Sequence, residues 1–138
     1  MSKLTQYWLD LCDSDLKAAK LLLKGKLYLQ CGYFCHQVVE KSFKAVIAHN
    51  EKTTPPKIHD LGKLATKAKI WDSLPKSMRK FIDDLEPLQI RGRYPEERTI
   101  IASTLTYKRC DYFVKGTEEI LCWIKERLGK SPSNLPKQ

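Results

Sequence analysis

The sequence lacks a long hydrophobic run, a secretory signal and the local motifs of several enzyme classes. No apolar stretch approaches the roughly 20 residues that a membrane-spanning helix requires. The N-terminus, MSKLTQYWLD, has no uninterrupted apolar core of the kind found in signal peptides. We therefore expect a cytoplasmic protein. There is also no Gly-rich phosphate loop, no metal-ligand cluster and no nucleophile–base pair, so we predict no cofactor, no metal site and no catalytic residue.

The cysteine pattern also gives no indication of disulfide bonds or of a zinc site. The chain has five cysteines, an odd number, and no CxxC pair. Cys31 and Cys35 have the i, i+4 spacing that places two side chains on one face of a helix, but no second pair completes a zinc site. We interpret the cysteines as small core hydrophobes.

Acidic residues are in the minority, and the formal net charge is +9. Each of the segments 1–50, 51–90 and 91–138 has an excess of basic residues, so the charge is not gathered in a tail. A folded basic domain attracts polyanions, nucleic acid above all, through a salt-dependent field. The alternative is a surface that is basic only for solubility.

Strand-like alternation is missing as well, and the apolar periodicity is helical throughout. The pattern predicts helices over 4–24, 28–50, 61–71, from Pro75 to about Leu88, and over 99–128. Gly116 lies inside the last of these and is expected to allow a close approach of another helix. We predict an all-α protein, an up-and-down bundle of four long helices plus one short helix. Residues 1–130 would form a single domain, and residues 131–138 a disordered tail.

The abrupt change of pattern at residues 90–97 is the main indication of function. Gly92 frees the backbone there, and Pro95 disfavours a helical conformation at Tyr94, so we expect a short non-helical joint. A joint needs only a turn, so the presence of Arg91, Arg93 and Tyr94 is not explained by the change of chain direction. Arginine makes bidentate contacts with phosphate, and tyrosine can stack on a base.

Two further residues, His59 and Lys41, are secondary candidates for the same site. His59 lies just before Asp60, a good N-cap for the helix that follows, and a loop can expose its imidazole. Lys41 belongs to a polar stripe on the second helix together with Gln37 and Lys44, and it could face a phosphate.

Structural explanations stay open beside these functional ones. Arg93 could form an ion pair with Asp84, Glu86 or Glu97, and Tyr94 could pack over the joint. The polar stripe of the second helix could be a solvated or inter-subunit face.

Several stretches resemble the HEPN family of small prokaryotic helical-bundle proteins, often encoded beside a minimal nucleotidyltransferase. They are LDLCDSDLKAAKLL (residues 9–22), YFCHQVVEKSFKAVI (residues 33–47), His59-Asp60-Leu61 and Arg93-Tyr94-Pro95. The similarity covers roughly residues 5 to 128. It implies a four- or five-helix bundle, a homodimer, and nucleotide or nucleic-acid binding near the dimer cleft.

Many HEPN relatives are RNA-cleaving toxins of toxin–antitoxin pairs, in which an arginine is followed after four to six residues by a histidine. This chain departs from that pattern, because no histidine follows Arg91 or Arg93 at all. We therefore predict a binding protein that uses Arg91, Arg93, Tyr94, His59 and Lys41. The alternatives are a metal-independent ribonuclease, with His59 as base and Arg93 as cation, and a pure protein-interaction subunit that docks a nucleotidyltransferase.

Overall fold

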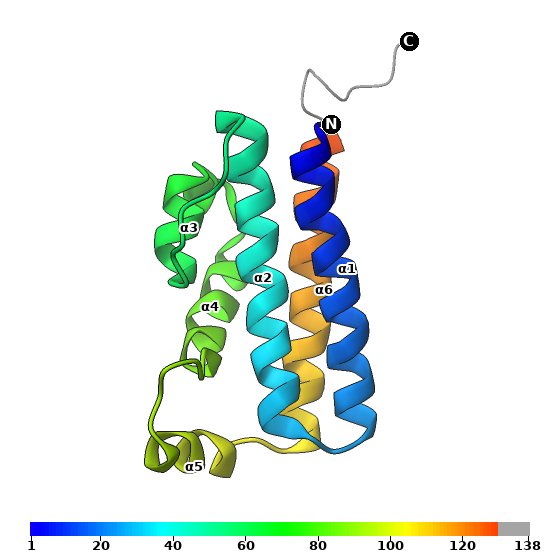
Figure 1. Ribbon diagram of the computed structural model, residues 1–138. Coiled ribbons are helices and arrows are strands. Elements are labelled where there is room, and N and C mark those ends of the chain that lie inside the picture. Colours follow the sequence, from blue (N-terminus) through cyan, green and yellow to red (C-terminus); the bar gives the residue numbers. More distant parts are fainter. Residues whose placement is uncertain (130–138) are drawn as a thin grey trace.

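The computed structural model describes residues 1–129, and their regular structure is entirely helical (Figure 1). The long helices are α1 (Lys3–Lys24), α2 (Tyr28–Glu51) and α6 (Tyr107–Gly129); the shorter ones are α3 (Leu61–Lys67), α4 (Lys76–Leu85) and α5 (Pro95–Ser103), with 3-10 turns η1 (Trp71–Ser73) and η2 (Glu86–Leu88). The all-α class is confirmed, but the expected four long helices are three. The predicted tail at 131–138 lies outside the described residues.

Helix α2 is the centre of the structure. It packs against α1, α6 and α3, and Figure 1 shows α1 and α6 on one side of it and α3 and α4 on the other. The broad apolar face of its sequence predicted burial on more than one side, and Val38, Phe43 and Ile47 are fully buried. No helix in residues 1–129 has the length and apolar character to cross a bilayer.

The helix starts follow the capping residues of the sequence. The Ser2 hydroxyl accepts the Thr5 N–H at 3.1 Å to start α1, and the Asp60 carboxylate accepts the Lys63 N–H at 2.9 Å to start α3. At the end of α1, Gly25 keeps a right-handed φ of −77°, and the next residue, Lys26, takes the left-handed φ of 60°.

The predicted helix over 99–128 is in fact two helices. The first begins earlier than expected, with Pro95 in the first turn of α5, where its missing N–H costs nothing. The break lies at residues 104–106. The Thr104 hydroxyl donates to the Ile101 carbonyl at 2.7 Å, and the Thr106 hydroxyl accepts the Arg109 N–H at 3.1 Å, which starts α6.

Gly116 allows the close approach that its position in the apolar stripe predicted. A Cβ atom at this position would lie 2.2 Å from Cε1 of Phe81, well inside contact distance. Phe81 of α4 also packs edge-on against Tyr112 of α6, with ring centroids 5.4 Å apart. The missing side chain therefore sets the distance between α4 and α6, which in turn places η2 and the joint that follows it.

Candidate functional site

A buried carboxylate, Glu40 on α2, is surrounded by three basic side chains. Its side chain is 3% exposed, and Oε2 lies 3.1 Å from Nζ of Lys44, one turn further along α2. Nδ1 of His59 lies 3.1 Å from the same oxygen and 3.2 Å from Oε1. Nδ1 of His36 lies 3.7 Å from Oε1. Because the carboxylate accepts at Nδ1, a neutral His59 carries its proton there and its lone pair on Nε2.

His36 lies between Glu40 and a second carboxylate, Glu86 of η2. Its imidazole is fully buried, Nε2 is 3.9 Å from Glu86 Oε2, and neither ring nitrogen has a hydrogen-bond partner among residues 1–129. Burial lowers the His36 pKa to about 4, so the ring is neutral near pH 7. Burial likewise raises the pKa of Glu86 to about 7, against the stabilising effect of the Leu61 N–H, which donates to both of its oxygens.

The loop before α3 holds His59 at the edge of this cluster. Asp60, the residue after His59, caps α3. The N–H of the following residue, Leu61, donates to Glu86 of η2, so the chain after His59 is bonded to both α3 and η2. The His59 side chain is 40% exposed, whereas the Glu40 side chain beneath it is almost completely buried. A histidine oriented by a buried carboxylate and open to solvent can exchange a proton or bind an anion.

Arg91 of the joint completes the exposed part of the site. One guanidinium nitrogen, Nη2, donates to the Tyr33 hydroxyl at 2.7 Å, and the other, Nη1, lies 3.5 Å from Nε2 of His59. The guanidinium carbon is 6.0 Å from the centre of the Tyr33 ring. We name Glu40, His59, Arg91 and Tyr33 the His59–Arg91 cluster. It exposes a guanidinium and an imidazole above a buried carboxylate.

The backbone of the joint explains how Arg91 reaches α2. Gly92 has φ of +79°, a left-handed conformation that glycine adopts without strain. The Arg91 N–H donates to Oε1 of Gln89 at 2.9 Å, and an Arg98 guanidinium nitrogen donates to the Ile90 carbonyl at 3.2 Å. The joint is shorter than predicted, because Pro95, Glu96 and Glu97 belong to α5.

Of the five predicted site residues, the structure brings together His59 and Arg91. Arg93 uses its donors locally: Nε donates to the Gln89 carbonyl at 2.8 Å, and Nη1 lies 3.2 Å from Glu97, one of the ion pairs foreseen as the structural alternative. Tyr94 is 72% exposed and lies on the joint. Lys41 pairs with Asp15 of α1 at 2.5 Å, so it is not part of the cluster.

Sequence reasoning missed Glu40, Tyr33, His36 and Glu86 as members of the site. A signal existed on α2, where Tyr33, His36 and Glu40 follow one another at helical spacings of three and four. The polar stripe was instead interpreted as a solvated or inter-subunit face, yet Gln37 and Lys44 are 4% and 6% exposed. Within residues 1–129 no group of three or more metal-ligating side chains could hold an ion.

Comparison with known proteins gives one family. A family model described as HEPN domain matches residues 5–128. No curated protein matches the sequence significantly.

Two solved structures share the fold. One is TT1696 from Thermus thermophilus, with a TM-score of 0.76 and 18% identity over 91% of this chain and 98% of that one. The other is ST0689, described as an archaeal HEPN homologue, with a TM-score of 0.70 and 17% identity over 92% of this chain and 98% of that one. At these identities the likeness concerns the fold.

Proposed function

The chain belongs to the HEPN domain family, and on that premise we propose that it binds the phosphate groups of nucleotides or single-stranded RNA at the His59–Arg91 cluster. The observation that carries this proposal is the approach of Arg91 to His59, with 3.5 Å between Nη1 and Nε2. In its neutral form His59 accepts this contact from the guanidinium on the Nε2 lone pair, so the pair together carries a single positive charge. Glu40 compensates from below, and the exposed side is open to a ligand.

Arginine and histidine suit phosphate in different ways. The guanidinium offers N–H groups in a fixed plane, and the bond to the Tyr33 hydroxyl orients it. The protonated form of His59 adds one directed donor at Nε2. Tyr33 adds an aromatic ring beside the guanidinium, on which a base can stack.

Fluorescence anisotropy with labelled single-stranded RNA tests the proposal, using Arg91→Gln beside Arg93→Gln as the matched control. The control removes an arginine two residues away, on the same joint, whose donors are used by Gln89 and Glu97. We expect Arg91→Gln to weaken binding roughly tenfold and to reduce the dependence on salt by about one phosphate contact. An equal loss of affinity in both variants would mean that RNA binds through the general positive charge of the surface. A loss of affinity in Arg93→Gln alone would place the binding site at Arg93.

A second candidate function, metal-independent cleavage of RNA, is favoured by the carboxylate–imidazole pair. His59 would take the proton of a 2′-hydroxyl at Nε2 as the 2′-oxygen bonds to phosphorus, and the 5′-oxygen would leave and take up a proton. Arg91 would stabilise the negative charge that develops on the phosphoryl oxygens. Arg91 thus takes the place that the sequence had suggested for Arg93. A gel assay in chelator decides between the two functions. Cleavage that disappears in His59→Gln supports the ribonuclease, whereas retention without cleavage supports binding alone.

The homodimer and the nucleotidyltransferase partner implied by the family are also proposals. Helix α5 supports an interface, because it has no buried residue and Ile100 is 68% exposed. We expect Ile100→Glu to convert a dimer into a monomer by light scattering after size exclusion. A monomeric wild type would contradict this. If the chain is a pure interaction subunit, a co-expressed nucleotidyltransferase should co-purify with it, and the isolated chain should not bind RNA.

A further inference from the structure

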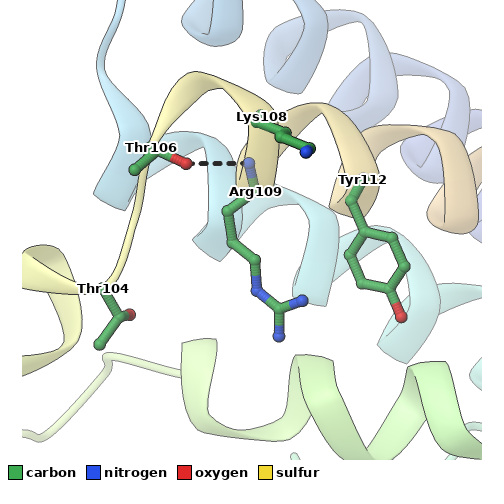
Figure 2. A pocket seen from close by; sticks show the side chains of 5 residues that line it. All are labelled: Thr104, Thr106, Lys108, Arg109 and Tyr112. Atoms are coloured by element: carbon green, nitrogen blue, oxygen red, sulfur yellow. Dashed lines mark hydrogen bonds between the residues drawn. The ribbon is translucent and has the colours of Figure 1, made fainter.

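A pocket of about 380 Å³ lies where α5 meets α6, and it shares no residue with the His59–Arg91 cluster. Its lining residues are Thr104, Thr106, Lys108, Arg109 and Tyr112 (Figure 2). The volume falls within the range of small-ligand sites, roughly 300–1,000 Å³. Three of the side chains that line it are hydroxyl-bearing, and the other two are cations.

The side chains that line the pocket carry positive charge and no negative charge. No carboxylate lines it, and across residues 1–129 neither Lys108 nor Arg109 has an ion-pair partner. Two acids lie nearby, Asp84 behind the lining Tyr112 and Asp111 on α6, and each has a partner. Asp84 accepts a hydrogen bond from the Tyr112 hydroxyl at 3.0 Å and lies 3.5 Å from Nζ of Lys80. Asp111 lies 2.8 Å from Nζ of Lys115, one turn further along α6.

Arg109 is held in place in a way that leaves its donors unused. Its guanidinium carbon lies 5.0 Å from the ring centre of Tyr112 and 4.6 Å from that of Phe113. Such stacking uses the flat face of the guanidinium and leaves the N–H groups at its edge free. Among the described residues that side chain makes no hydrogen bond, and Figure 2 shows it extended between Thr104 and Tyr112.

One hydroxyl of the pocket can also donate. Thr104 donates to the Ile101 carbonyl and Tyr112 to Asp84, so both of these hydrogens are used. Thr106 accepts the Arg109 backbone N–H, which leaves its own O–H available. A guanidinium, an ammonium and a hydroxyl donor without an acceptor carboxylate match the oxygens of a phosphate group.

We propose that this pocket is a second anion site that binds a phosphate group, independently of the His59–Arg91 cluster. The phosphate could come from a small phosphorylated ligand or from the backbone of RNA, because both present the same oxygens to Arg109. Inorganic pyrophosphate represents the first source. A trinucleotide RNA without terminal phosphates represents the second.

Isothermal titration calorimetry with each probe tests the proposal in an Arg91→Gln background, so that the first site does not contribute. We expect at least one probe to bind, and Arg109→Gln to weaken that binding roughly tenfold. The matched control is Arg127→Gln, which removes an exposed arginine stacked on Trp123 of the same helix at 5.4 Å. This control should bind as the background does.

Binding of pyrophosphate would indicate a small phosphorylated ligand, and binding of the trinucleotide would indicate the RNA backbone. Because Arg109 packs on two rings, circular dichroism checks the fold of Arg109→Gln, and Lys108→Gln, whose side chain is exposed, repeats the test if that fold is lost. Failure of both probes to bind, or equal binding with and without Arg109 and Lys108, would overturn the second site. Neither outcome would bear on the His59–Arg91 cluster.

Discussion

At the scale of single residues, Glu40 determines the arrangement of the site. It is the contact that Lys44 and His59 have in common, and its carboxylate is almost completely buried. Replacing it by an amide would leave Lys44 buried without a counter-charge and would offer His59 one neutral acceptor oxygen in place of two carboxylate oxygens. A carboxylate in this position therefore serves both the stability of α2 and the chemistry at His59.

We expect Glu40→Gln to lower the free energy of unfolding by about 3 kcal/mol, because breaking a buried ion pair from one side leaves the partner charge uncompensated. Chemical denaturation measures the change. Asp111→Asn is the matched control, since it breaks an exposed i, i+4 pair on α6, and it should unfold close to the wild type. A stable Glu40→Gln protein would show that Lys44 is not held by this pair.

The two perturbed groups beside Glu40 give opposite dependences of stability on pH. Glu86 has its pKa raised from 4.5 to about 7, so the folded state keeps a proton that the unfolded chain releases, and stability falls as pH rises through this window. His36 has its pKa lowered from 6.5 to about 4, so the unfolded chain takes up the proton first, and stability falls as pH drops through that window.

Glu86→Gln separates the two effects, because an amide still accepts the Leu61 N–H but does not ionise. We expect the melting temperature of the variant, relative to wild type, to rise between about pH 5 and about pH 8. A difference that stays constant with pH would mean that Glu86 ionises normally in the folded state.

The sequence predicted the exposed residues of the site, His59 and Arg91, better than the buried carboxylate of Glu40. Arg91 and His59 were identified from the joint and the cap, which are local signals. Their meeting was not predictable, because they are 32 residues apart in the chain and are brought together by two residues of α2, Glu40 under His59 and Tyr33 beside Arg91. The amphipathic pattern itself was misleading, since polar residues on a helix normally face solvent, whereas Gln37, Glu40 and Lys44 are buried.

At the scale of helices, caps and periodicity predicted most starting points, and local side-chain bonds produced the main error. The segment IIASTLTYK keeps its apolar residues at helical spacing, which favoured one helix over 99–128. The hydroxyls of Ser103 and Thr104 bond to carbonyls of the last turn of α5, and Thr106 begins a new helix. That competition between side chain and backbone does not appear in hydrophobic periodicity.

Gly116 gives a prediction at this scale. Alanine is a better helix former than glycine, yet Gly116→Ala should destabilise the protein by about 1–3 kcal/mol. The new Cβ would overlap the Phe81 ring and push α4 away from α6. Thermal unfolding measures the change. In Gly62→Ala, the control, the nearest atom to the new Cβ is 3.5 Å away, so this variant should be at least as stable as wild type. Recovery of stability in Gly116→Ala with Phe81→Leu would confirm the cause.

At the scale of the whole molecule, helix α5 separates two cationic groups. Arg91 precedes it on the joint, and Lys108 and Arg109 follow it at the start of α6. Figure 1 shows α5 at the end of the structure where α1 turns into α2 and where α6 begins. The excess of positive charge is spread along the sequence, but the two cationic groups proposed here as anion sites both adjoin α5.

The central claim is that a phosphate ligand meets His59 and Arg91. Nuclear magnetic resonance of the imidazole signals tests it most directly, because the chain has three histidines, His36, His49 and His59, and His59→Gln assigns the relevant one. Titration with adenosine 5′-monophosphate should shift the His59 signals to saturation, and Arg91→Gln should abolish that shift while Arg93→Gln preserves it. Saturable binding of the nucleotide with unchanged His59 signals would contradict the account.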